Sequence, residues 1–139
     1  MIEQVFSTSL EESNLVGNVY FSNYGKWLGK VRDLYLFKAR PQHYIGSSIE
    51  REFSSTHADI YHLSEAMPFD QVRVIMSLDK IHEKGVSLYF EFFKEGPGPQ
   101  RRRLAYATNS IVWGALKQGV FLPERLPSDV LRDLNQLAA

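Results

Sequence analysis

Residues 19–38 read VYFSNYGKWLGKVRDLYLFK, and this stretch decides the fold. Large apolar side chains recur in it at intervals of three and four residues, the period of an α-helix: Tyr20, Tyr24, Trp27, Val31 and Tyr35. Phe21, Leu28, Leu34 and Leu36 widen the apolar surface beyond one stripe. A helix that is apolar around most of its circumference needs other elements packed around it. We therefore predict a long, buried helix over residues 19–38.

Two glycines interrupt this helix, and Pro41 sets the latest point at which it can end. Gly25 and Gly29 lie four residues apart and therefore on one face. Each costs about 1 kcal/mol of helix stability relative to alanine. We expect a packing reason for this cost, namely a close approach of the helix to a sheet.

The rest of the chain is mostly typical of β-structure. Val72, Val74, Met76 and Leu78 alternate with more polar residues, which is the period of a strand with one buried face. Strands are expected over residues 2–10, 49–62, 72–78, 86–94 and 104–116, and a last helix begins at residues 127–129. One strand, a long helix and a run of antiparallel strands predict an α+β fold in a single domain, residues 1–139.

Composition limits the possible functions. A chain of 139 residues with 44% hydrophobic and 13% aromatic residues can bury one globular core. Sixteen basic residues balance sixteen acidic ones, so no net field attracts nucleic acid or an anionic membrane. The absence of cysteine excludes disulfides, thiolate metal sites and a cysteine nucleophile. Without a signal-peptide pattern or an apolar run of about 20 residues, we expect a cytoplasmic protein.

Residues 11–24, EESNLVGNVYFSNY, carry the strongest functional signal. They resemble hot-dog thioesterases of the 4-hydroxybenzoyl-CoA type, in which an acidic loop residue precedes a small-residue turn, a central helix and a tyrosine. Here Asn14 stands in the place of the usual catalytic aspartate. With that departure, residues 14–20 are similar to the thioesterases of enediyne polyketide biosynthesis. The likeness continues at Trp27, at Arg32, and at residues 57–61, 69–72 and 97–99.

This resemblance implies a hot-dog fold, with one long central helix wrapped by a five- to six-stranded antiparallel sheet. It also implies a dimer or tetramer that hydrolyses the thioester of a polyketide or β-keto acyl chain. The chain would be carried on the phosphopantetheine of an acyl carrier protein, and the released product can lose carbon dioxide. No further cofactor is expected. A thioesterase associated with polyunsaturated fatty acid synthases is chemically close to such an enzyme and is an alternative.

Thioester hydrolysis needs an oxyanion stabiliser and an oriented water, usually with a carboxylate as base or nucleophile. Backbone N–H groups around Gly17 to Val19, at the predicted helix start, can face the thioester oxygen, and the helix dipole adds about half a positive charge there. Asn14 cannot ionise, so its predicted role is to hold the carbonyl or the water. The alternatives are a plain helix-entry turn and an Asx-turn.

Arg32 and Tyr24 complete the predicted catalytic group with Asn14 and Gly17. A guanidinium at position 32 can stabilise developing negative charge or bind a β-keto oxygen. Its structural alternative is an ion pair with Asp33, Glu50 or Asp59. Tyr24 either donates a hydrogen bond near the thioester or fills the core.

Substrate contacts are expected from a second set of residues: Asn18, Val19, Tyr20, Trp27, His57 and Asp59. His57 and Asp59 are two apart in a strand and share a face, as a base, as metal ligands or as a hydrogen-bonded pair that shapes the pocket or a dimer edge. Although His62 follows them, we expect no metal site. The cluster Arg101, Arg102 and Arg103 is either a solvated hairpin tip or a docking site for an acidic carrier protein.

Two rival functions remain open from the sequence. The first is a general acyl-CoA thioesterase. The second, of a different class, is a non-catalytic hot-dog module that binds an acyl chain or scaffolds a synthase.

Overall fold

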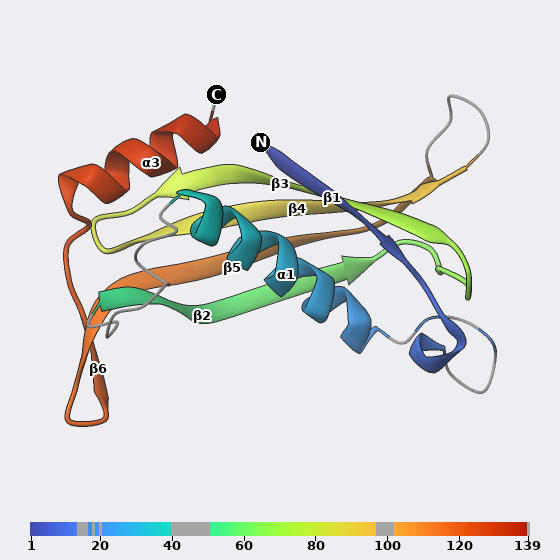
Figure 1. Ribbon diagram of the computed structural model, residues 1–139, viewed down its shortest axis with the longest axis horizontal. Coiled ribbons are helices and arrows are strands. Elements are labelled where there is room, and N and C mark those ends of the chain that lie inside the picture. Colours follow the sequence, from blue (N-terminus) through green and yellow to red (C-terminus); the bar gives the residue numbers. More distant parts are fainter. Residues whose placement is uncertain (14–16, 18, 20, 40–50, 97–101, 139) are drawn as a thin grey trace.

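The computed structural model describes residues 1–13, 17, 19, 21–39, 51–96 and 102–138. These residues form a mixed α/β fold (Figure 1). In chain order the elements are β1 (Ile2–Ser7), a short 3-10 helix (Leu10–Glu12), α1 (Ser22–Ala39), β2 (Arg51–His62), β3 (Gln71–Ile81), β4 (Gly85–Glu95), β5 (Arg102–Lys117), β6 (Val120–Pro123) and α3 (Ser128–Ala138).

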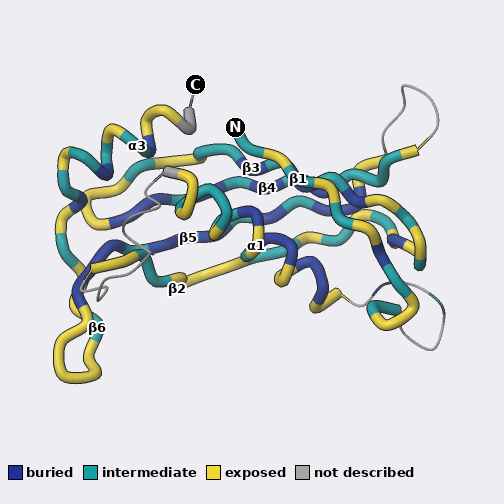
Figure 2. Tube along the Cα trace, in the orientation of Figure 1, coloured by how far each residue is buried: buried dark blue, intermediate teal, exposed yellow. Residues whose placement is uncertain are grey.

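The strands form one antiparallel sheet of six strands in the order β1-β3-β4-β5-β2, with β6 paired to the end of β5. Helix α1 runs across one face of this sheet, which we call the inner face, and the opposite face is the outer face (Figure 1). Among the described strands, β2 pairs only with β5, so it forms an edge. Its 12 residues are largely exposed (Figure 2).

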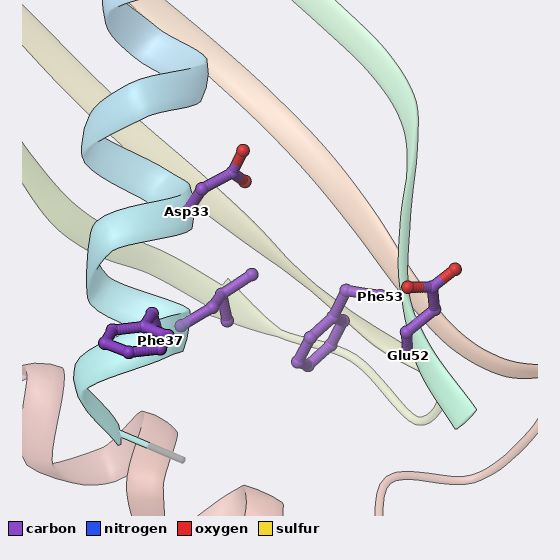
Figure 3. Close-up of a pocket in the computed structure, with 5 residues that line it drawn as sticks. Asp33, Phe37, Glu52 and Phe53 are labelled. Atoms are coloured by element: carbon purple, nitrogen blue, oxygen red, sulfur yellow. The ribbon is translucent and has the colours of Figure 1, made fainter. Parts of the chain in front are cut away.

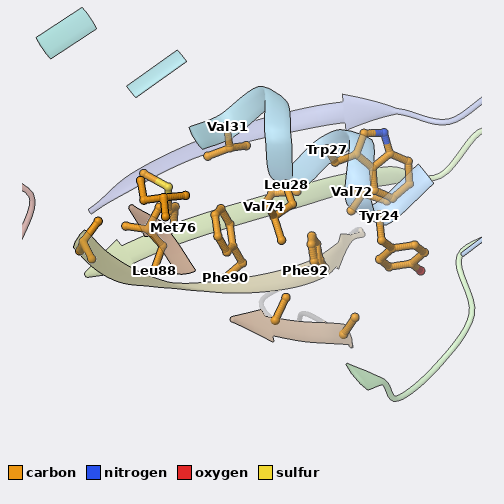
Figure 4. Close-up of a cluster of buried hydrophobic side chains, with 14 of the residues drawn as sticks. Tyr24, Trp27, Leu28, Val31, Val72, Val74, Met76, Leu88, Phe90 and Phe92 are labelled. Atoms are coloured by element: carbon orange, nitrogen blue, oxygen red, sulfur yellow. The ribbon is translucent and has the colours of Figure 1, made fainter. Parts of the chain in front are cut away.

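The core lies between α1 and the inner face (Figure 4). The predicted alternation in β3 is confirmed, because Val72, Val74 and Met76 are completely buried. Leu88, Phe90 and Phe92 of β4 point to the same side, and α1 adds four buried side chains: Tyr24, Trp27, Leu28 and Val31. Each fully buried side chain of this size contributes about 1.5–3 kcal/mol to folding.

Helix α1 begins at Ser22, three residues later than predicted from Val19. Val19 is instead paired with Ser13 in an isolated β-bridge. The helix has 18 residues, and the expectation of one long central helix is met only in part, because α3 is a second packed helix. Val130 and Leu134 of α3 are buried, and the Tyr35 hydroxyl of α1 donates a hydrogen bond to the Asp133 carbonyl at 2.8 Å.

The prediction that Gly25 and Gly29 allow a close approach to the sheet is wrong. A Cβ on Gly25 would meet no described atom within 4 Å, and one on Gly29 would meet only Nη2 of Arg32, at 3.7 Å. The glycines lie away from the buried stripe. Bulky side chains such as Trp27 and Tyr24 fill the space between α1 and the sheet.

A β-bulge in β2 controls which of its side chains face α1. Ser55 is opposite Ile111 and His57 is opposite Ser110, so Thr56 has no partner in the register. Because strand side chains alternate, one extra residue moves every following side chain to the other face. Ser55 therefore faces inward, whereas His57 and the residues at positions 59 and 61 face outward.

No described helix is long and apolar enough to cross a membrane.

We expect the Phe90→Ala variant to lose about 3–5 kcal/mol of unfolding free energy, because it leaves a cavity at a completely buried site. Chemical denaturation with fluorescence detection measures this loss. Leu116→Ala, at a side chain that is 58% exposed in β5, is the control and should change stability by less than about 0.5 kcal/mol. Equal losses in the two variants would contradict this account of the core.

Candidate functional site

The segment that leads into α1 is fixed to the turn before β3. The Val19 amide donates to the Ala66 carbonyl at 2.9 Å, and both residues are buried. Gly17 has a φ of +90°, a conformation that glycine adopts without strain. Asn14, Asn18, Tyr20 and Arg101 lie outside the described residues, so their roles stay predictions.

Tyr24 lies at the start of α1 with only 1% of its surface exposed. Its ring packs against Trp27 at 5.1 Å and Phe92 at 5.3 Å between centroids. Burial raises the pKa of Tyr24 to about 12, although a hydrogen bond with the Ala66 backbone acts in the opposite direction. The hydroxyl therefore stays protonated at neutral pH. It therefore cannot serve as a base at that pH.

His62, at the end of β2, completes the surroundings of Tyr24. Its ring stacks on Phe21 at 4.2 Å and meets Tyr24 edge-on at 4.7 Å. Its Nδ1 is buried without a hydrogen-bond partner in the described structure, and burial lowers the pKa of the imidazole. The ring is therefore neutral at pH 7. From the sequence, His62 was weighed only as a metal ligand. The available sign that it faces the core was its position two residues after Ile60, on the same face of the strand.

Arg32 lies on α1 about two turns beyond Tyr24, on the side of the helix that faces β2. Its Nε donates to Asp33 at 3.0 Å, which is one of the ion pairs expected as a structural alternative. Its Nη1 donates to Oδ1 of Asn109 at 3.1 Å. The side chain is 21% exposed, so the guanidinium lies at the boundary between core and solvent.

Asn109 is the site residue that sequence analysis missed. It is completely buried in the middle of β5. Its amide nitrogen donates to the Ser55 hydroxyl at 2.9 Å and to the His57 carbonyl at 2.8 Å. The available signal was an asparagine in the same alternating pattern as Ala107 and Ile111, because a polar side chain at a buried strand position needs specific partners.

His57 and Asp59 do share a face, as predicted, but it is the outer face. They form a hydrogen-bonded pair at 2.6 Å, with side chains 61% and 48% exposed. The bulge at Thr56 separates this pair from Arg32, which contacts the inner face. Among the described residues, no three His, Cys, Asp or Glu side chains gather in a way that could hold a metal ion.

Arg103 of the basic cluster lies on the outer face, where it already has partners. Its guanidinium forms an ion pair with Glu91 at 3.2 Å, donates to the Tyr89 hydroxyl at 2.6 Å and lies 4.8 Å from the Tyr106 ring centroid. Arg102 is exposed at the start of β5. Both side chains are exposed, and Arg103 already has the partners named above.

A pocket of about 360 Å³ opens between the second half of α1 and the start of β2 (Figure 3). Its walls are apolar at Leu36, Phe37 and Phe53, with Asp33 and Glu52 at the sides. Because Asp33 binds Arg32, the pocket begins beside the guanidinium. Its volume falls within the range of small-ligand sites, about 300–1,000 Å³.

The fold is that of the hot-dog thioesterases, as the resemblance implied. The dynemicin thioesterase is similar over 99% of this chain and 96% of its own, with 25% identity and a TM-score of 0.87. The 4-hydroxybenzoyl-CoA thioesterase from Pseudomonas sp. strain CBS-3 has 14% identity and a TM-score of 0.81 over 95% of this chain and 97% of its own. A gentisyl-coenzyme A thioesterase has 20% identity and a TM-score of 0.77 over 96% and 99%.

No protein-family model matches the sequence, and the comparison with curated proteins found no match. The structural neighbours are thioesterases, and they support thioester hydrolysis as the reaction class.

Burial of His62 predicts a pH dependence of stability. Its pKa in the folded chain lies below the ordinary value of 6.5, so below that pH the unfolded chain takes up a proton that the folded chain resists. Stability should therefore fall as pH drops from 7 to about 5. His62→Phe keeps the aromatic packing and should show a shallower fall in denaturation experiments. His82→Phe, at an exposed histidine, is the control. If the unfolding free energy of His62→Phe fell with pH as steeply as that of the wild type, the assignment to His62 would be refuted.

Proposed function

We propose that this protein hydrolyses the thioester of a polyketide or β-keto acyl chain carried on an acyl carrier protein, releasing a product that can decarboxylate. The observation that carries this proposal is the guanidinium of Arg32. It lies beside a pocket with three apolar and two acidic lining residues, on the helix whose start is the predicted thioester site. A solved thioesterase with this fold, the dynemicin thioesterase, binds a polyene.

The direction of the Arg32 side chain supports its proposed role of stabilising negative charge at the thioester. Side chains in a helix lean toward its N-terminus. Nη2 of Arg32 would be 3.7 Å from a Cβ on Gly29, one turn nearer the start of α1. Gly29 thus leaves the guanidinium uncovered on that side. The arginine would attract the developing negative charge of the thioester or a β-keto oxygen, while N–H groups at the helix start stabilise the oxyanion.

Catalysis without a carboxylate base fits the described surroundings. Asp33 is bound to Arg32, and Tyr24 remains protonated. Asn14, in the place of the usual aspartate, would orient the carbonyl or the water. A solved 4-hydroxybenzoyl-CoA thioesterase carrying an aspartate-to-asparagine mutation holds its substrate bound, which supports retention of binding without a carboxylate. Loss of base assistance costs about 10²–10⁴-fold in rate, so turnover should be slow.

A general acyl-CoA thioesterase is the second candidate, because solved structures of this fold include thioesterases for 4-hydroxybenzoyl-CoA and gentisyl-CoA. Hydrolysis of one acyl group presented on coenzyme A and on a carrier protein separates the two. A carrier-protein substrate should have the higher kcat/KM. A higher value for the coenzyme A ester would favour this alternative.

We also propose that the protein forms a dimer or tetramer and that Arg102 contacts the carrier protein. The long exposed edge of β2 supports self-association, since an unpaired edge strand is a ready template for another chain. Light scattering coupled to size exclusion gives the oligomeric state directly. A monomer at micromolar concentration would contradict the first part of this proposal.

Arg32→Ala should lower kcat by about 10²–10³-fold, as expected for the loss of a group that stabilises transition-state charge. Thiol release from an acyl carrier protein measures the rate, and the absence of cysteine in this chain gives the thiol reagent no background. Lys26→Ala, at an exposed cation of the same helix, is the matched control and should retain wild-type activity. Equal rates for Arg32→Ala and wild type, with both proteins folded, would show that Arg32 has no catalytic role; a wild type indistinguishable from both Asn14→Ala and Arg32→Ala would favour a non-catalytic module.

The pocket should set the acyl-chain length. Leu36→Trp fills space between α1 and β2, so we expect KM for long acyl chains to rise at least tenfold while short chains react as before. Steady-state kinetics on a chain-length series tests this. Leu122→Trp, at an exposed position of β6, is the control. A uniform effect across chain lengths would show that the acyl chain binds elsewhere.

A further inference from the structure

We propose that Asn109 is a positioning residue that fixes the guanidinium of Arg32 for catalysis. This inference deepens the proposed function and rests on it. Asn109 belongs to β5, whereas Arg32 belongs to α1, and their side chains are joined by a hydrogen bond of 3.1 Å.

The orientation of the Asn109 amide is determined by its partners. The His57 carbonyl can only accept a hydrogen bond, so the amide nitrogen must face it, at 2.8 Å. The second amide hydrogen is directed to the Ser55 hydroxyl at 2.9 Å. Oδ1 is therefore left to accept from Arg32. Three partners from two elements hold one amide, so it cannot turn without losing hydrogen bonds in the core.

Burial makes this arrangement costly to disturb. Asn109 has no exposed surface, and an unsatisfied buried polar group costs about 1–3 kcal/mol. Hydrogen bonds to a charged donor are about twice as strong as neutral ones. Asn109 thus fixes Nη1 of Arg32 from the core side, while Asp33 fixes Nε from the solvent side.

A neutral partner is what this role requires. A guanidinium has five N–H donors, and Asn109 and Asp33 take one each. Asn109 fixes its donor without adding a second negative charge, so the cation keeps more of its attraction for a thioester oxygen. A leucine at 109 would have nearly the same shape but would leave Nη1 without its acceptor, so that Asp33 alone would hold the guanidinium.

A double-mutant cycle on thioester hydrolysis tests the proposal. We expect Asn109→Leu to lower kcat about 10-fold or more with KM changed by less than about twofold, the pattern of a lost transition-state interaction. In the Arg32→Ala background the same substitution should change kcat by less than about twofold, because its effect acts through Arg32. Thr108→Val, at the neighbouring position on the outer face, is the matched control and should keep wild-type rates.

Full activity in folded Asn109→Leu, or equal effects in the two backgrounds, would overturn the inference. If Asn109→Leu does not fold, Asn109→Ser enters the same cycle, since its hydroxyl remains polar but is too short to reach Arg32. An activity-independent measurement separates this inference from the proposed function. ¹⁵N NMR of Arg32 should show slow rotation of the guanidinium in the wild type and faster rotation in the Asn109 variant. Inactive wild type would overturn the proposed function alone, whereas unchanged rotation would overturn the positioning role.

Discussion

One extra residue in β2 determines the chemistry available on each side of the sheet. Thr56 has no partner in the register with β5, and the alternation of side chains is therefore inverted beyond it. Without the bulge, His57 and Asp59 would face α1 and bring a carboxylate into the core. With it, they form a solvent-exposed pair, and the inner face keeps Ser55 beside Asn109. The core next to Arg32 is consequently free of that acidic side chain.

The bulge and the guanidinium depend on each other through Asn109. Its amide nitrogen bonds to both sides of the bulge, at Ser55 and at the His57 carbonyl, and its oxygen bonds to Arg32. The irregular backbone of β2 thus has its polar groups satisfied by the same side chain that orients the cation on α1. Bulges are frequent next to active sites because they redirect side chains, and here the redirection is tied to a helix across the core.

Much of the fold was predictable because it depends on local periodicity. The alternation around Val74 identified β3, the apolar stripe through Trp27 identified α1, and Pro127 with its following residues marked the start of α3. The bulge was not predictable, because it arises from pairing with β5, a partner 54 residues away. The prediction for Gly29 failed for a different reason, because the nearest atom to a Cβ there belongs to a side chain of its own helix and not to the sheet.

The candidate site was predicted only in part, because one of its contacts joins residues that are far apart in the sequence. Arg32 was identified by its resemblance to a motif, but its partner Asn109 is 77 residues away and became visible only when the strands were paired. An asparagine differs from an aspartate here in one physical respect that matters. It accepts a hydrogen bond without a full negative charge, so the field of the cation is only partly compensated. Asp33 is more exposed than Arg32, so water screens its charge more strongly and it compensates the cation less than a buried carboxylate would. If hydrolysis proceeds without a carboxylate base, as we propose, its barrier has to be lowered by stabilising charge, and a cation that is only partly compensated can supply that stabilisation.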